Sequence, residues 1–213
     1  MPTFSTDIDL LHWEPNILKD AEFASQTLLQ STADLSETTL SLLSGSLVDA
    51  QVEAGQAVYV AGAINGSFPI VTIDSPTQLT LSILYDKLYD APPTPGRGGP
   101  DATGVSIAIR TFWAQRQVVT ELLLHAAGLT ANDFAKVLNP QSLKRACVLG
   151  TLQMIYNALA AAAAESSIYA IRAALYEKLY RRALRSARVE LDLNGDGKTD
   201  CVRKLNTLEL IRG

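Results

Sequence analysis

Residues 57–82 read AVYVAGAINGSFPIVTIDSPTQLTLS, and the period of this stretch indicates its secondary structure. Apolar residues, many of them β-branched, recur at every second position in three short runs. Asn65-Gly66 and Asp74-Ser75-Pro76 separate the runs, and residues of these types form tight turns because they tolerate unusual backbone angles. Short alternating runs between turns predict antiparallel strands.

The same pattern continues on both sides of this stretch. SLVDAQVE (46–53) precedes it and VSIAIRTFW (105–113) follows it. Residues 91–104, APPTPGRGGPDATG, contain four prolines and four glycines, so regular structure is not expected there. The runs together predict a β-module over residues 43–113, a small antiparallel barrel or sandwich.

Helical periodicity surrounds the β-module. NILKDAEFASQTLLQS (16–31) carries an apolar stripe, which predicts a helix within an N-terminal helical segment, residues 1–42. After Trp113 we expect helices over 115–128, over 129–138, from Ser142 onward and over 167–188. The last of these places one apolar stripe at Ile168, Ile171, Ala174, Leu175, Leu179 and Ala183.

These elements predict an α+β protein. An α-helical bundle, residues 114–188, is interrupted upstream by the inserted β-module. An acidic turn and an extended C-terminal arm, residues 189–213, follow it. We expect the arm to attach to a partner through Arg203, Lys204, Leu208, Leu210 and Ile211, because these apolar residues are too few to form a core.

The charge is low and unevenly distributed. Charged residues make up 19% of the chain, below the usual quarter, so a surface covered by other proteins or a compact apolar fold would each explain the composition. Residues 1–101 hold 3 basic and 13 acidic residues, a net charge of −10, and residues 102–213 hold 15 and 9, a net charge of +6. Such polarity suits subunits that stack head to tail, or two separately solvated faces.

Three features bear on cellular location: a signal peptide, a membrane span and a disulfide framework. Its first residues, MPTFSTDIDLLHW, contain no basic and apolar signal-peptide pattern. The run Ala146–Ala164 is too polar for a membrane span. Cys147 and Cys201 do not form a disulfide framework, so we expect free thiols in a reducing compartment.

The segment LDLNGDGKTD (191–200) resembles the first half of a calcium loop. Asp192, Asn194, Asp196 and Asp200 supply oxygens at loop positions 1, 3, 5 and 9, and Gly197 occupies the position of the sharp turn. Position 12, which should hold an acid, is Arg203. Asn-Gly and Asp-Gly pairs are also strong turn formers. We therefore favour a compact turn that aims the arm, with weak calcium binding as the alternative.

Basic residues gather on the last predicted helix. Arg181, Arg185 and Arg188 are spaced i, i+4, i+7, and Lys178 lies about one turn earlier, so the four would share a face. That face would contact DNA phosphates or a neighbouring subunit, or would be solvated. No recognition motif for bases accompanies it.

No arrangement typical of catalysis appears. His12 and His125 lie among apolar residues, and the chain has no nucleophile elbow, phosphate-binding loop or dinucleotide motif. Zinc-type ligand spacing is also absent. We expect a protein that is not an enzyme and that needs no cofactor, with calcium as the one candidate metal.

Three helical stretches and the short tail after them resemble the head-to-tail connector, or adaptor, proteins of tailed-phage necks. They are HWEPNILKDAEFASQTLL (12–29), LKRACVLGTLQMIYNALA (143–160) and YEKLYRRALRSARVELDLNGDG (176–197). The resemblance implies a ring of identical subunits, twelve in number, that joins the portal protein to a tail-side neck protein. It also implies a central channel for double-stranded DNA, a place in the virion neck and assembly in the host cytoplasm.

Two other functions remain open from the sequence. The acidic turn and the β-module would also suit a calcium-dependent module that binds a protein or glycan, although Arg203 argues against it. The chain could also be another virion structural protein, such as a tail-completion or baseplate protein, which its sequence pattern would suit equally well.

Overall fold

The computed structural model describes residues 2–82, 101–163 and 168–205. The chain divides into two compact units. One is continuous, residues 6–112, and we call it the barrel unit. The other combines residues 1–5 with residues 113–213, and we call it the helical unit. The predicted α+β class with a small antiparallel barrel is confirmed.

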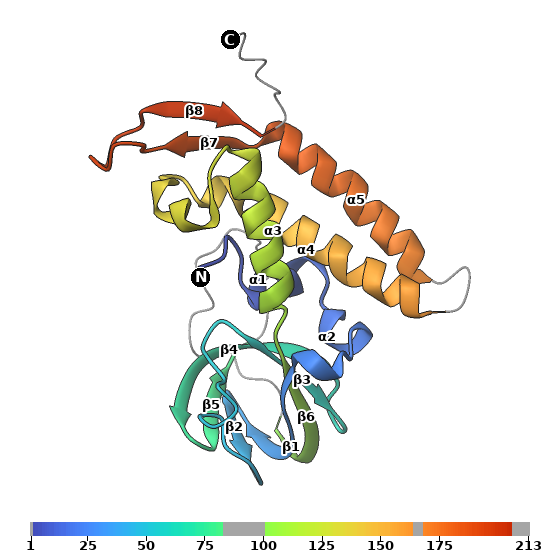
Figure 1. Cartoon of the computed structure of the whole chain (residues 1–213). Coiled ribbons are helices and arrows are strands. Elements are labelled where there is room, and N and C mark those ends of the chain that lie inside the picture. Colours follow the sequence, from blue (N-terminus) through green and yellow to red (C-terminus); the bar gives the residue numbers. More distant parts are fainter. Residues whose placement is uncertain (1, 83–100, 164–167, 206–213) are drawn as a thin grey trace. The chain divides into compact units, whose positions relative to one another are not determined.

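In the barrel unit, the described strands close into a six-stranded antiparallel barrel (Figure 1). Their order around the barrel is β1-β2-β5-β4-β3-β6, and β6 pairs back with β1. The strands are β1 (Thr27–Ser36), β2 (Thr39–Leu42), β3 (Ala57–Ala61), β4 (Gly66–Ser75), β5 (Gln78–Leu81) and β6 (Ala102–Arg110). Because the barrel is closed, each of these strands has a neighbour on both sides.

The barrel interior is filled by the alternating apolar residues. Val58 of β3 lies opposite Ile109 of β6, and Leu40 of β2 lies opposite Leu79 of β5; all four are completely buried. They belong to one cluster of valine, leucine, isoleucine and alanine side chains contributed by every strand. The barrel therefore has its own hydrophobic core, as the period-two pattern predicts.

The predicted N-terminal helix is wrong beyond Asp20. The chain forms α1 (Asp7–Trp13), α2 (Ile17–Asp20) and the short 3₁₀ helix η1 (Ala24–Gln26), and then enters β1. Leu28 and Leu29, read as part of a helical stripe, pack against the barrel core instead. Strand pairing of β1 with both β2 and β6 supplies more backbone hydrogen bonds and burial than a short isolated helix would, so tertiary structure overrides the local pattern.

The predicted limits of the β-module change accordingly. It begins near Thr6 rather than at residue 43, whereas its end at Phe112 agrees with the prediction to one residue. The run 46–53, read as a strand, is a turn-rich connection between β2 and β3. Leu47 and Val52 are buried in the barrel core from this connection, which explains its apolar character.

A buried carboxylate joins the two ends of the barrel unit. Asp7 is 2% exposed. Its carboxylate accepts a hydrogen bond from the Phe112 backbone N–H at 3.0 Å and another from the Thr111 hydroxyl at 2.8 Å. Thr6 begins α1 with a capping box shared with Asp9. The chain therefore enters and leaves the barrel unit at neighbouring points, as an inserted domain requires.

In the helical unit, the predicted helices are present. They are α3 (Trp113–Ala126), the 3₁₀ helix η2 (Ala131–Lys136), α4 (Gln141–Ala162) and α5 (Ile168–Ser186). Thr130 begins η2 with a capping box completed by Asp133. A hairpin of β7 (Arg188–Leu191) and β8 (Cys201–Lys204) follows α5. Part of the segment predicted as an extended arm is thus the strand β8.

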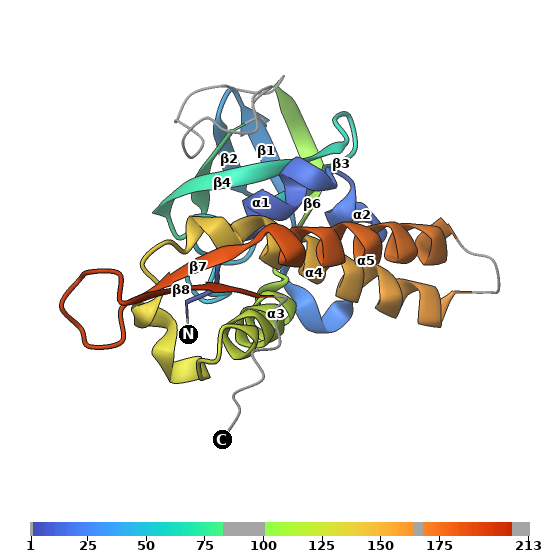
Figure 2. The same cartoon turned by 90° about the horizontal axis from the view of Figure 1, so that it is seen from above.

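Helices α4 and α5 lie side by side along most of their lengths, as both views show (Figures 1 and 2). Tyr156 of α4 is completely buried, and its ring stacks on Tyr176 of α5 with centroids 5.6 Å apart. Arg172 of α5 donates a hydrogen bond to the Tyr156 hydroxyl at 2.8 Å. Gly150 lets the Tyr180 ring approach, since a Cβ there would lie 3.0 Å from a ring carbon. Aromatic rings therefore form the contact.

Among the helices described, none has the length and apolar character needed to span a bilayer.

Candidate functional site

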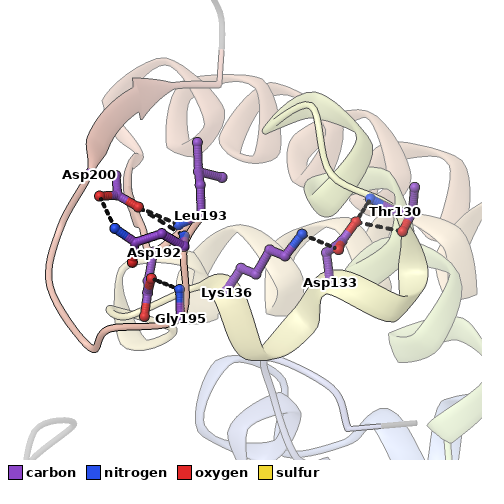
Figure 3. A network of polar contacts seen from close by, with 8 residues as sticks. Thr130, Asp133, Lys136, Asp192, Leu193, Gly195 and Asp200 are labelled. Atoms are coloured by element: carbon purple, nitrogen blue, oxygen red, sulfur yellow. Dashed lines mark hydrogen bonds and ion pairs between the residues drawn. The ribbon is translucent and has the colours of Figure 1, made fainter.

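The acidic segment forms the turn between β7 and β8, and the Asp192 carboxylate organises it (Figure 3). Asp192 is 7% exposed. Its Oδ1 accepts the Gly195 backbone N–H at 2.6 Å, and its Oδ2 accepts the Gly197 backbone N–H at 2.7 Å. Both glycines have φ near +80°, a conformation that suits glycine because it has no Cβ.

Asp200 closes the same turn from its other end. Its Oδ2 accepts the backbone N–H groups of Leu193, at 2.7 Å, and Asn194, at 3.1 Å. Its Oδ1 accepts the side-chain amide of Asn194. Asp196 lies farther along and accepts the Lys198 backbone N–H. The structure thus brings the four predicted residues into one turn, with each acidic or amide side chain bonded to local backbone.

The backbone amides also set the ionisation of Asp192. The N–H groups of Gly197 and then Gly195 hold the pKa of this carboxyl below its ordinary value, because they stabilise the charged form. Among the described residues, no three His, Cys, Asp or Glu side chains are grouped to hold a metal ion. The carboxylates shape the turn directly, which supports the turn interpretation of this segment.

The hairpin is attached to the helical unit along β7. Leu191 forms a β-bridge with Val137, and the Asp192 N–H donates to the Lys136 carbonyl at 2.9 Å. The Asn139 side chain extends this pairing: its Oδ1 accepts the Glu190 N–H at 2.9 Å, and its amide donates to the Arg188 carbonyl. The turn therefore projects from a fixed base.

A second carboxylate stabilises the segment that supports β7. Asp133 lies 2.8 Å from the Lys136 ammonium and accepts the Thr130 hydroxyl and backbone N–H (Figure 3). Lys136 and then Thr130 hold the Asp133 pKa well below its usual range. These contacts all lie within residues 130–136, and the Lys136 carbonyl of this segment accepts the Asp192 N–H.

Arg203 is used inside the helical unit. Its Nη1 donates to the Ala127 carbonyl just after the C-terminal end of α3, where a cation is favourable to the helix dipole. Gly128, with φ +70°, makes room for it, since a Cβ at residue 128 would lie 2.2 Å from Nη1. Arg203, predicted to attach the arm to a partner, thus has a structural contact within its own chain, and attachment through it stays a prediction.

The rest of the predicted arm is only partly visible. Lys204, the last residue of β8, is exposed. Leu208, Leu210 and Ile211 lie outside the described residues. Attachment through these four residues stays a prediction.

The predicted basic face on α5 is present in part. Lys178, Arg181 and Arg185 are exposed on α5, and Arg181 forms an ion pair with Glu177. Arg188 does not continue this face, because α5 ends at Ser186 and Arg188 begins β7. Ala187, between the two elements, is buried. Arg182, which the predicted face omits, is exposed as well.

The first part of the predicted apolar stripe of α5 faces outward, which the sequence did not indicate, whereas Ala183 at its end is buried. An amphipathic helix usually buries its apolar stripe. Here Ile168, Ile171 and Leu175 are 56%, 66% and 51% exposed. The buried side consists of Ala173, Tyr176 and Ala183, which meet α4 through the tyrosine contacts. The tyrosines at 176 and 180 were the signal that could have identified the packed side.

The histidines and cysteines show no catalytic arrangement in the described residues. His125, which we read as a histidine of the core or of an interface, is exposed on α3, so it does not belong to the core of this chain. Cys147 and Cys201 are unpaired. Burial raises the Cys147 pKa, and its sulfur accepts a hydrogen bond from the Ser5 hydroxyl at 3.1 Å. Arg116 donates to the Ser5 carbonyl at 2.6 Å, so this cluster holds the N-terminal residues on the helical unit.

No protein-family model, curated protein or solved structure matches the chain.

Proposed function

We propose that this chain is a structural subunit of a tailed-phage neck, an adaptor that assembles as a ring between the portal protein and the tail. The outward face of α5 carries the proposal. Three large aliphatic side chains are more than half exposed on one helix, and exposed apolar groups of this kind mark protein–protein contacts. The helical stretches that resemble connector proteins cover most of α4 and the second half of α5.

The division of charge agrees with assembly. The barrel unit, residues 6–112, holds 4 basic and 13 acidic residues, a net charge of −9. The remaining residues hold 14 and 9, a net charge of +5. The boundary between charges thus coincides with the boundary between units. Such a subunit attracts a second copy only in orientations that place unlike units together.

The proposal assigns no catalytic step and no resident metal. The turn carboxylates serve as acceptors for backbone amides, which supports a structural turn. Lys178, Arg181 and Arg185 would contact a neighbouring subunit or the phosphates of DNA in the channel. The extension after β8 would attach to the portal or to the tail-side neck protein.

Native mass spectrometry tests this function. The chain is measured alone and after mixing with the portal protein of the virus that carries its gene. We expect a large cyclic oligomer, either alone or on the portal. Ile171→Ser with Leu175→Ser should weaken assembly, whereas Leu193→Ser, on the exposed β7–β8 turn, should not. A chain that stays monomeric alone and leaves the portal bare would overturn the proposal.

A further inference from the structure

The outward face of α5 has two halves of different character. Ile168, Ile171 and Leu175 form an apolar half near the start of the helix. Lys178, Arg182 and Arg185 continue the same face toward its end, because the six positions follow the i, i+3, i+7 spacing over the whole helix. The described residues that line a hollow there are Ala174, Glu177, Lys178, Arg181, Arg182 and Arg185. An acidic, partly apolar surface would complement this face.

In the barrel unit, the connection between β2 and β3 carries exposed residues of both kinds within eleven positions. Leu43 and Val48 are 58% and 60% exposed there. Asp49 and Glu53 are exposed on the same connection. No other segment of the barrel unit's described residues carries two large aliphatic side chains of this exposure. We call these four residues the barrel patch.

The barrel patch is held in place by the barrel itself. Leu47 is completely buried, and its N–H donates to the Pro76 carbonyl at 2.7 Å. The Val52 N–H donates to the Leu47 carbonyl at 2.9 Å, and Val52 packs into the barrel core. Val48 and Asp49 lie between these anchors. A surface that is already ordered loses little conformational entropy on binding, so it favours association.

We propose that the outward face of α5 docks on the barrel patch of a second copy of this chain. This inference rests on the proposed function and specifies its subunit contact. The apolar halves bury one another, and Lys178, Arg182 and Arg185 meet Asp49 and Glu53. Because the two surfaces are different parts of one chain, the contact is head to tail. In a pair, one copy keeps a free α5 face and the other keeps a free barrel patch, so further copies can bind at each end. Repetition of such a contact closes a ring when the rotation between copies permits.

Charge reversal tests the contact. Arg182→Glu alone, and Asp49→Lys or Glu53→Lys alone, should each weaken association about tenfold or more, because like charges then face one another. Association should return when Arg182→Glu is combined in one chain with Asp49→Lys or Glu53→Lys. It should also return when the two single variants are mixed, because each copy then offers a complementary surface to the other.

A matched control shows whether restoration depends on where the new lysine lies or only on the net charge of the chain. Glu37 is exposed on the turn between β1 and β2, outside the barrel patch. Arg182→Glu with Glu37→Lys has the same net charge as the restoring combinations, and we expect it to stay weak. Sedimentation velocity over a range of concentrations gives the association constants. The same series is repeated with the portal protein present, so that assembly seeded by the portal is also measured.

The outcomes distinguish this contact from the proposed function. If the wild type assembles and none of the reversals weakens it, or if Glu37→Lys restores it equally well, the docking proposal is wrong and the adaptor function stands. If the wild type stays monomeric alone and with the portal, both are overturned. Weakening by each single reversal and restoration by both routes would support the contact.

Discussion

Arg203 and Gly128 form a pair in which each residue depends on the other. The guanidinium needs the space that a missing Cβ leaves, and the end of α3 needs the guanidinium to satisfy the Ala127 carbonyl. Seventy-five positions separate them in the chain, so neither residue reveals its role locally. Arg203 occupies the position where a calcium loop requires an acid, and its structural contact explains that departure.

Gly128→Ala should destabilise the helical unit more than a glycine change elsewhere. We expect about 1–2 kcal/mol from the left-handed backbone and about 0.5–1.5 kcal/mol more because the guanidinium moves aside and loses its hydrogen bond to the Ala127 carbonyl. Urea denaturation followed by circular dichroism measures it.

Gly195→Ala is the control, because its φ is +82° and nothing lies near its absent Cβ. It should cost only the backbone part. In a chain that already carries Arg203→Ala, Gly128→Ala should lower the stability only by about the backbone part, because no guanidinium remains to be displaced. Equal losses for the two glycine variants would contradict the pairing.

Asp192 should make stability depend on pH in the acid range. Its folded pKa is lowered by the Gly197 and Gly195 amides, so its stabilising effect is present above the unfolded pKa, about 3.9. The effect is lost as the pH falls through the folded value. Asp192→Asn should therefore be less stable than the wild type at pH 7, with a smaller difference at pH 3. Urea midpoints at the two pH values measure this, with Glu37→Gln as a surface control. An equal difference at both pH values would count against the prediction.

At the scale of elements, period and turn chemistry predict most of the fold. β3 to β5 and all four helices after residue 112 lie where the sequence places them, because their alternation or capping residues agree with their packing. β6 (Ala102–Arg110) begins inside the stretch 91–104 that we expected to be irregular, because its first residues pair with β1. β1 was missed because Leu28 and Leu29 fit a helical stripe as well as a strand, and only the pairing with β6 decides between them. The packed side of α5 was missed because tyrosine rings replace aliphatic side chains in its contact with α4.

The candidate site was predictable only where it is local. Asp192, Asn194, Asp196 and Asp200 form a turn because asparagine, aspartate and glycine govern the backbone over a few residues. Arg203 and the outward face of α5 depend on contacts between distant segments, which a single sequence does not contain.

The β7–β8 hairpin sets where the chain can be shortened. Deleting residues 203–213 should unfold part of the helical unit, because it removes half of β8 and the cation at the end of α3. Deleting residues 206–213 should keep the fold, since β8 is retained. Thermal denaturation by circular dichroism compares the two. If the first deletion melts like the wild type, β8 is dispensable. Loss of portal binding in the folded shorter deletion would support attachment by the arm.

At the scale of the whole molecule, the barrel unit has a complete core and neighbouring ends. We expect residues 6–112 to fold when expressed alone, with the β-rich circular dichroism of a closed barrel. Residues 1–5 joined to 113–213 by a short Gly/Ser linker should retain the helical signal, because Asp7 shows that the two crossing points are close.

Asp7→Ala is the informative variant of the isolated barrel unit. It should lower the stability by about 1–3 kcal/mol, since it leaves the Phe112 N–H without its partner. An isolated barrel unit that aggregates, or a linker version without helical signal, would show that the two units share one core.

The helical unit is formed from two separate parts of the chain, residues 1–5 and 113–213, so the two units become complete at different times during translation. Residues 6–112 form an uninterrupted stretch, so every strand of the barrel has been synthesised before α3 begins. The N-terminal residues that Arg116 and Cys147 hold must wait for those partners, and the end of α3 must wait for Arg203. At about 5–20 residues per second, the stretch from α3 to Arg203 takes roughly 5–20 s to make. A nascent chain would thus carry all residues of the acidic barrel unit before α5, the helix that we propose as the docking helix, has been made.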